Sequence, residues 1–436
     1  MVYHPEFKQW IAENQALFLK DLARIIRIPS KKSVATTEAP FGEANLNVLR
    51  EALTIANEYG FSTKMVENVV GYAQLGEEED YIGVVGHLDV VPEGEGWSSP
   101  PYELTLRDEK LYARGVLDNK GPIMACLFAL KLLQDHEVPL KRTVRIVFGT
   151  DEESGSQDMP LYLAKEKAPI FGFTPDCKYP VVYGERGILR VGITTKITAD
   201  SFTHLGAIVG SQDPSFIPDS LTTVFQGRMF TASGKRSPSN APELGENSIT
   251  LLAKQLEEGL THEDDLKDYL AWIVAHLHQQ HQGEGLGLNW SDSDSGMLQI
   301  SPYRWTKQDD GMCLEISIRY PVTVTEEAVL EQLTKVLPKQ STLNVLRSLP
   351  STVFPKEHWG VQKLVTVYEE VMHEDGQPVT TTGATYARFV PNIVAFGPSF
   401  PGQKGIAHNP DEYMDLTDWL KNIEIYMHAI LALAND

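Results

Sequence analysis

The chain has 436 residues, 42% of them hydrophobic and 22% charged, which is typical of a soluble globular protein with two domains. It carries 38 basic and 59 acidic residues, and the resulting net charge of −21 argues against a nucleic acid or an anionic membrane as partner. Its three cysteines, Cys126, Cys177 and Cys313, have no CxxC spacing, which favours a reducing compartment. There is neither a signal-peptide pattern nor an apolar run of about 18 residues, so we expect a cytoplasmic protein with no membrane partner.

The first part of the chain alternates between helices and short apolar strands. The apolar spacing predicts helices over 6–27, 42–59, 122–134 and 159–167, with strands over 62–67, 71–75, 82–92 and 143–148 and a hairpin over 104–113. An alternation of strand, helix and strand indicates an α/β sheet.

The pattern changes from about Gly187. Strands are predicted over 188–195, 312–319 and 344–350, and helices over 246–258, 263–278 and 325–336. After His358, a helix over 361–372 and a strand over 392–396 restore the first style. We therefore predict an α/β fold, a mixed sheet flanked by helices, built from residues 1–186 and 356–436. An inserted α+β lid domain, residues 187–355, interrupts it.

The valine-rich strand over 82–92 ends with His87 and Asp89. Residues two apart on a strand point to the same side, so the pair suits a metal-binding histidine beside a carboxylate that orients it or positions a water. The alternative is a core histidine followed by a turn-forming aspartate. In open α/β sheets, ligands bind outside the carboxyl ends of such strands.

Four further places put acidic or imidazole groups after a strand or in a glycine-marked loop, and they contain Asp118, Glu152 and Glu153, Asp176, and His408. Each has a plainer reading: a helix cap, a solvated acidic run, a turn residue and a loop histidine. Together they form a complete set for two metal ions that share one bridging carboxylate. A further carboxylate remains as general base.

At these residues the chain resembles the co-catalytic di-zinc peptidase family that includes aminoacylase, glutamate carboxypeptidase and carnosine dipeptidase. It looks most like the bacterial dipeptidase V (Xaa-His dipeptidase) branch. The matching motifs are Gly86-His87-Leu-Asp89-Val-Val-Pro92, Arg114-Gly-Val-Leu-Asp118-Asn-Lys-Gly121, Gly149-Thr-Asp-Glu152-Glu153-Ser-Gly155, Thr174-Pro-Asp176 and Ala407-His408-Asn-Pro-Asp-Glu412. Gly383-Ala-Thr-Tyr-Ala-Arg388 and Ile318-Arg319-Tyr-Pro321 also look like family elements.

The resemblance implies two divalent metal ions per chain, with Zn²⁺ as the first expectation and Mn²⁺ or Co²⁺ as alternatives. It implies that His87, Asp118 and Asp176 hold one ion and that Asp118, Glu153 and His408 hold the other. Asp118 then bridges, through a peptide bond to Asn119 that is typically cis in this family.

The resemblance also implies roles for residues that bind no metal. Asp89 orients His87, and Glu152 is the general base that takes a proton from the bridging water and delivers it to the leaving amine. Arg319 receives the substrate's C-terminal carboxylate, and Arg388 is a second candidate for that task.

The chain departs from the family pattern in the lid. Pro238 stands where the family carries a histidine that helps to stabilise the oxyanion, and the loss of one oxyanion donor typically costs about 10²–10³ in turnover. His204 or a histidine of the cluster His276, His278 and His281 could substitute. Otherwise the substrate differs from an ordinary dipeptide, or the enzyme is a weak hydrolase.

The leading prediction is a metal-dependent dipeptidase, monomer or homodimer, that acts on short peptides with a free carboxylate. Two alternatives stay open. One is an N-acyl amino acid deacylase with the same chemistry, and the other is a catalytically weakened peptide-binding relative.

Overall fold

The computed structural model describes residues 3–436, which divide into two compact units. The first unit comprises the described residues up to Tyr183 together with Phe354–Val379 and Gly383–Asp436, and the second comprises Gly184–Val353 and Thr380–Thr382. Among the described residues, no helix is both long and apolar enough to cross a membrane.

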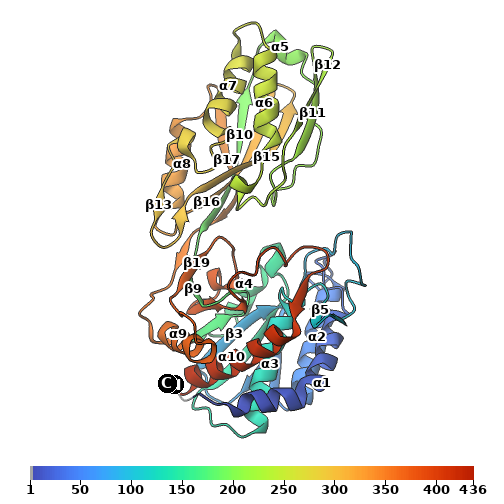
Figure 1. The fold of residues 1–436 in the computed structure, drawn as a ribbon, viewed down its shortest axis with the longest axis vertical. Helices are drawn as coiled ribbons and strands as arrows, with labels where there is room; N and C mark the ends of the chain where they lie inside the picture. Colours follow the sequence, from blue (N-terminus) through green and yellow to red (C-terminus); the bar gives the residue numbers. More distant parts are fainter. Residues whose placement is uncertain (1–2) are drawn as a thin grey trace. The chain divides into compact units, whose positions relative to one another are not determined.

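The first unit is an α/β layer structure around a mixed sheet (Figure 1). Its sheet strands, in spatial order, are β1 (Ser62–Val66), β2 (Val70–Leu75), β6 (Thr143–Gly149), β3 (Tyr81–His87), β7 (Phe171–Thr174), β20 (Ile393–Phe396) and β9 (Val181–Glu185). The strands β6, β3, β7 and β20 run parallel to one another, whereas β1, β2 and β9 pair antiparallel with their neighbours.

The helices of this unit are α1 (Glu6–Ile26), α2 (Glu43–Glu58), α3 (Lys120–Asp135), α4 (Asp158–Leu163), α9 (Trp359–Met372) and α10 (Leu416–Ala434). Small strands complete it: β4 (Thr105–Arg107), β5 (Lys110–Tyr112), β22 (Tyr413–Asp415), β8 (Cys177–Lys178) and β21 (Pro398–Ser399).

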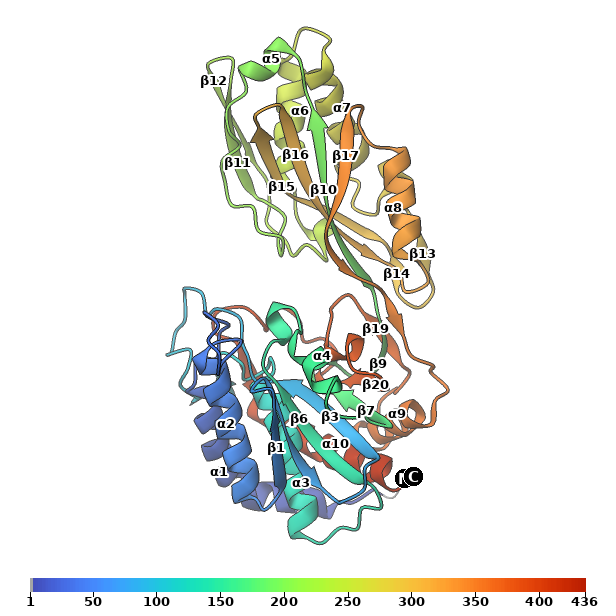
Figure 2. The ribbon, with the colours of Figure 1, turned by 180° about the vertical axis from the view of Figure 1, so that it is seen from behind.

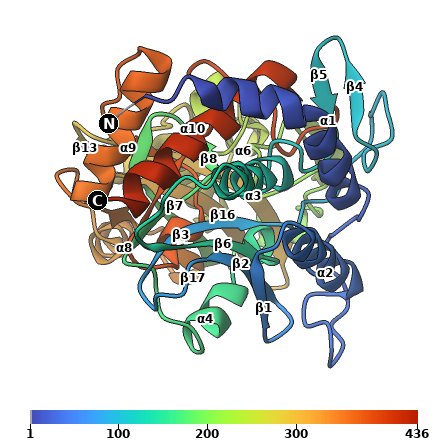
Figure 3. The ribbon, with the colours of Figure 1, turned by 90° about the horizontal axis from the view of Figure 1, so that it is seen from below.

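Both faces of this sheet are buried, as the alternation along its central strands requires. Ile82 and Val84 of β3 belong to the large core beneath α1, α2, α3, α9 and α10, whereas Val85 belongs to a smaller core that includes Met159 and Tyr162 of the α4 segment. Figure 3 shows α3 and α10 on one side of the β3 and β6 strands and α4 on the other. A parallel strand with two covered faces reads as the continuous apolar run seen in the sequence.

The second unit has an antiparallel four-stranded sheet in the order β15 (Gln299–Gln308), β16 (Gly311–Tyr320), β10 (Gly187–Lys196) and β17 (Ser341–Leu349). The helices α6 (Ser248–Gly259) and α7 (Asp265–Leu277) cover one face of it (Figure 2). The remaining elements are α5 (Asp200–Thr203), α8 (Glu326–Lys335), the hairpin β11 (Ser220–Phe225) and β12 (Arg228–Ser233), and the short strands β13 (Ser291–Asp292), β14 (Gly296–Met297), β18 (Thr352–Val353) and β19 (Val379–Thr381).

The prediction of an α/β fold with a mixed sheet and flanking helices is confirmed. Most predicted elements occur within a few residues of their expected bounds, but the sequence pattern did not reveal α10, β15 or the hairpin of β11 and β12. The sequence of α10 is apolar on nearly every side because α1, α3 and α9 surround it. An amphipathic stripe, the usual sign of a helix, is therefore weak there.

Candidate active site

Three neighbouring parallel strands of the first unit end at one edge of the sheet, and predicted ligands lie at or just beyond their ends. His87 is the last residue of β3 and pairs with Gly149, the last residue of β6. Glu152 and Glu153 begin a short helical turn after β6, and Asp176 follows β7. The carboxyl ends of parallel strands meet at the same edge, so residues far apart in sequence come together there.

Asp118 lies between two imidazoles. Its Oδ1 is 3.1 Å from Nε2 of His87, and its Oδ2 is 2.9 Å from Nε2 of His408, which also lies 3.0 Å from Oε1 of Glu153. The peptide bond between Asp118 and Asn119 is cis. The alternative reading of Asp118 as a helix cap is wrong, because Asn119 occupies the N-cap of α3 and no side chain caps that helix.

Asp176 and Glu152 approach the same histidine from the other side. Oδ2 of Asp176 is 3.6 Å from Nε2 of His87. Two groups of ligand atoms each lie within 4.8 Å: one from His87, Glu152 and Asp176, the other from His87, Asp118 and Glu153. Imidazole nitrogens and carboxylate oxygens at this spacing fit one or more divalent ions such as Zn²⁺, Mn²⁺ or Co²⁺.

Asp89 contacts both His87 and the turn that carries the two glutamates. Nδ1 of His87 is 3.0 Å from the backbone carbonyl oxygen of Asp89 and 3.4 Å from its carboxylate. The same carboxylate accepts the backbone N–H groups of Glu152 at 3.2 Å and Glu153 at 3.1 Å. Asp89 therefore holds the glutamate turn against the end of β3, a contact that sequence spacing does not reveal.

The electrostatics of the metal-free cluster are those of an anion-rich site that lacks cations. Burial raises the pKa of Asp176 to about 7, and burial together with the charge of Asp176 raises the pKa of Glu152 well above its usual range. Burial would raise the pKa of Asp118 too, but hydrogen bonds with His408 and His87 hold it below its usual value. Nearby cations favour ionised carboxylates, so divalent ions would offset the burial of these groups.

Glu412 organises the loop that carries Asp118, and the sequence gave it no role beyond its place in a motif. It is buried, and its Oε1 accepts the backbone N–H groups of Gly115 at 3.0 Å, Leu117 at 2.9 Å and Asp118 at 3.1 Å. Its Oε2 pairs with Nη1 of Arg114 at 2.6 Å. Because Glu412 follows His408 by four residues, it ties the two loops that bear the facing ligands.

Asn119 makes a second tie that the sequence did not suggest. Its Oδ1 accepts the backbone N–H of His87 at 3.2 Å, and its Nδ2 donates to the carbonyl of Pro175 at 2.6 Å, next to Asp176. A Cβ on Gly86 would lie 2.5 Å from Oδ1 of Asn119. The glycine of the Gly-His-Leu-Asp motif therefore leaves room for this amide.

The two predicted substrate-binding arginines lie in different units. Arg319 is on β16 of the second unit, and its Nη1 donates to the carbonyl oxygen of Thr382 at 3.4 Å. Arg388 ends a short turn of the first unit, Tyr386–Arg388, and its Nη2 donates to the carbonyl of Gly383 at 3.2 Å.

Pro238 lies in the second unit, where it forms an isolated antiparallel bridge with Phe216. The histidines considered as substitutes for the expected lid histidine, His204, His276, His278 and His281, belong to the same unit. His276 contacts the carbonyl oxygen of Trp272 through Nδ1 at 2.9 Å, and Nδ1 of His278 lies 3.1 Å from the hydroxyl of Thr250.

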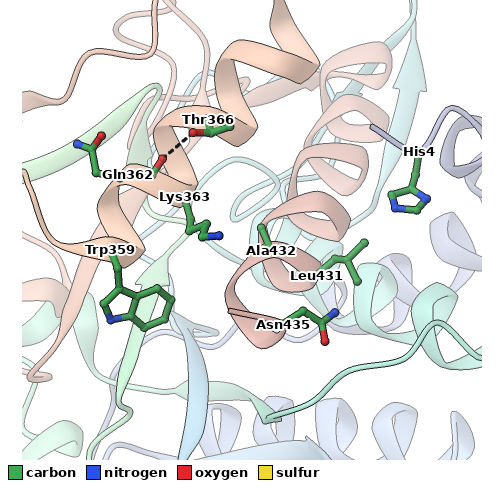
Figure 4. Close-up of a pocket in the computed structure, with 8 residues that line it drawn as sticks. All are labelled: His4, Trp359, Gln362, Lys363, Thr366, Leu431, Ala432 and Asn435. Carbon is green, nitrogen blue, oxygen red and sulfur yellow. Dashed lines mark hydrogen bonds between the residues drawn. The ribbon is translucent and has the colours of Figure 1, made fainter. Parts of the chain in front are cut away.

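A cavity of about 560 Å³ between α9 and α10 contains none of the predicted residues (Figure 4). Lys363 on its rim pairs with Asp436 at 2.9 Å. The side chain of Asn435 donates to the carbonyl of Pro139 and accepts the backbone N–H of Lys141. Most of its polar groups are thus occupied by the protein itself, and the cluster at the strand ends remains the candidate site.

Comparison with known proteins agrees with this geometry. Residues 83–432 match the model of Peptidase family M20/M25/M40, which covers most of the chain. The protein therefore belongs to this family of peptidases and is a hydrolase of peptide bonds, as the motif resemblance predicted. The family is metal-dependent, in agreement with the clustered ligand atoms.

Relatives of similar length extend the match over the whole chain. A "Putative dipeptidase YtjP" of Bacillus subtilis (strain 168) is 30% identical over 95% of this chain and 97% of its own. A "Beta-Ala-Xaa dipeptidase" of Lactobacillus delbrueckii subsp. lactis is 29% identical over 99% of this chain and 98% of its own. The crystal structure of human carnosine dipeptidase 1 shares the fold, with a TM-score of 0.64 and 15% identity over 98% of both chains.

Proposed function

We propose that the protein is a dipeptidase that uses two divalent metal ions and hydrolyses short peptides with a free C-terminal carboxylate. The observation that carries the proposal is the convergence of two imidazoles and four carboxylates at the edge of one sheet, with Asp118 between His87 and His408. The dipeptidase names of the full-length relatives support the substrate class.

In this proposal His87, Asp118 and Asp176 hold one ion, and Asp118, Glu153 and His408 hold the other. The 3.6 Å separation of His87 and Asp176 supports the first set, and the short contacts of His408 with Asp118 and Glu153 support the second. When bound, the ions would supply a Lewis acid for the scissile carbonyl and lower the pKa of a water between them.

Glu152 is the proposed general base, and it would take a proton from that water at one carboxylate oxygen and pass it to the leaving amine. Its carboxylate lies within reach of the groups that hold the first ion, while its backbone is held by Asp89. Arg319 or Arg388 would receive the substrate carboxylate, because a planar guanidinium pairs with a carboxylate in a bidentate manner.

The direct test is an activity screen of protein loaded with Zn²⁺, Mn²⁺ or Co²⁺. The substrates are unblocked dipeptides, the same dipeptides with a C-terminal amide, and N-acetyl or N-succinyl amino acids. We expect cleavage of unblocked dipeptides with at least one metal and little cleavage of the amides.

Two results would replace the proposal. Preferential cleavage of N-acyl amino acids would identify a deacylase. No cleavage, together with a rise in melting temperature when a dipeptide binds, would identify the weakened peptide-binding relative that Pro238 suggests. We also propose a cytoplasmic location, which the three free cysteines support.

A further inference from the structure

Two buried carboxylates hold four consecutive backbone N–H groups at the start of the glutamate turn. Oδ2 of Asp158, the first residue of α4, accepts the N–H groups of Thr150 at 2.7 Å and Asp151 at 3.1 Å. Asp89 accepts the N–H groups of the next two residues, Glu152 and Glu153. The backbone that positions Glu152 therefore depends on Asp158 as well as on Asp89.

Asp158 is held in turn by Tyr386. The Tyr386 hydroxyl donates to the same Oδ2 atom at 2.5 Å, and both side chains are fully buried. Burial raises the pKa of Asp158 to about 7, and the hydroxyl of Tyr386 opposes this rise. A hydrogen bond to a buried carboxylate is stronger than one between neutral groups, so this hydroxyl fixes the carboxylate in place.

The surrounding backbone is shaped to admit this hydroxyl. A Cβ on Gly149, at the end of β6, would lie 2.1 Å from the Tyr386 oxygen and 2.6 Å from Oδ2 of Asp158. The Tyr386 ring also stands edge-on to the ring of His87, with centroids 6.3 Å apart. The tyrosine therefore contacts a proposed metal ligand and the support of the proposed base at once.

We propose that Tyr386 is a positioning residue for hydrolysis, which acts through Asp158 on the backbone of residues 150–153 and thereby sets the place of the Glu152 carboxylate. This inference rests on the proposed function of Glu152. Tyr386 itself touches no substrate: its segment reaches the turn through one hydroxyl and one carboxylate, and it also carries Arg388 two residues later.

The test is Tyr386→Phe, which removes one oxygen and keeps the ring against His87. We expect kcat to fall about 10–100-fold, the loss of one hydrogen bond to a charged group, with KM changed by less than about three-fold. Metal content, measured by elemental analysis, stays as in the wild type. By hydrogen exchange and mass spectrometry, the amides of residues 150–153 should exchange at least about 10-fold faster.

Tyr59→Phe is the matched control, because the Tyr59 hydroxyl also donates to a buried carboxylate, Asp21, at 2.5 Å in the same unit. Its loss should leave kcat and exchange over 150–153 unchanged while it lowers the melting temperature. Asp158→Asn and the double variant with Tyr386→Phe complete a cycle, in which non-additive losses in kcat place both residues on one route.

A Tyr386→Phe enzyme with kcat within about two-fold of the wild type would overturn the inference, as would equal losses in Tyr59→Phe, which would mean a general loss of stability. Hydrogen exchange separates this inference from the proposed function. If the wild type cleaves no peptide but Tyr386→Phe alone loosens residues 150–153, the contact holds the turn and the proposed hydrolysis is wrong. Unchanged exchange would overturn the inference whatever the activity.

Discussion

The two units use their sheets in different ways. In the first unit, parallel strands β6, β3 and β7 end side by side, and His87, the Glu152 turn and Asp176 lie at that one edge. In the second unit, the four-stranded sheet is antiparallel, so neighbouring strands end at opposite edges. Chemically active side chains can therefore collect from several loops in the first unit but not from the strand ends of the second.

The buried ion pairs differ in the same sense. In the first unit, Arg114 and Glu412 are both buried, and Glu412 also accepts three backbone N–H groups. In the second unit, Arg304 and Glu315 lie 3.4 Å apart across two strands, with the arginine side chain 42% exposed. The first pair organises a ligand-bearing loop, whereas the second decorates the sheet.

The largest expected effect concerns the strand-end cluster itself. Glu152→Ala should lower kcat about 10³-fold or more, because a positioned general base contributes about 10²–10⁴. Metal content should not change. Exposed Glu78 of the same unit is the control, since Glu78→Ala removes an equal charge. Near-normal turnover of Glu152→Ala would remove it as the base.

The second prediction compares the two ion pairs. Glu412→Ala should lower the free energy of unfolding of the metal-free protein by about 3–5 kcal/mol, because it leaves the Arg114 guanidinium buried and unpaired. Glu315→Ala should cost about 1 kcal/mol or less. Urea denaturation measures both values, and similar costs would contradict the distinction between the pairs.

Metal removal should act on the first unit alone, because every proposed ligand belongs to it. At a free metal concentration of 100 times Kd, binding stabilises by about 2.7 kcal/mol per site. Chelation should therefore lower the melting temperature. It should speed amide exchange near His87 and His408 but not in β10 or β16. Equal changes in both units would contradict this.

The smallest expected effect concerns the second unit. Arg319→Ala should raise KM about 10-fold or more for unblocked dipeptides, the loss of a charged hydrogen bond, and leave KM for the C-terminal amides unchanged. Arg304→Ala, a change of the same kind in the same sheet, should have little effect. An equal rise in KM for amides would exclude Arg319 as the carboxylate partner, and the same substrates then test Arg388→Ala.

The sequence was sufficient for the family, the α/β class and the set of clustered residues. Each predicted ligand sits beside a glycine, a proline or a strand end, so local patterns locate it, and the order of motifs along the chain identifies the whole set. It was insufficient for α10, whose apolar surroundings erase the helical stripe, and for the outer strands of the second unit.

The contacts that hold the site in place depend on the folded backbone. Asp118 and Glu412 are 294 residues apart, and Asp158 and Tyr386 are 228 apart. Whether a carboxylate meets a given N–H or hydroxyl depends on which loops the sheet brings together, and no periodicity or motif records that. Residue chemistry at strand ends is written locally in the chain, whereas the partners that orient it are chosen only when the strands have paired.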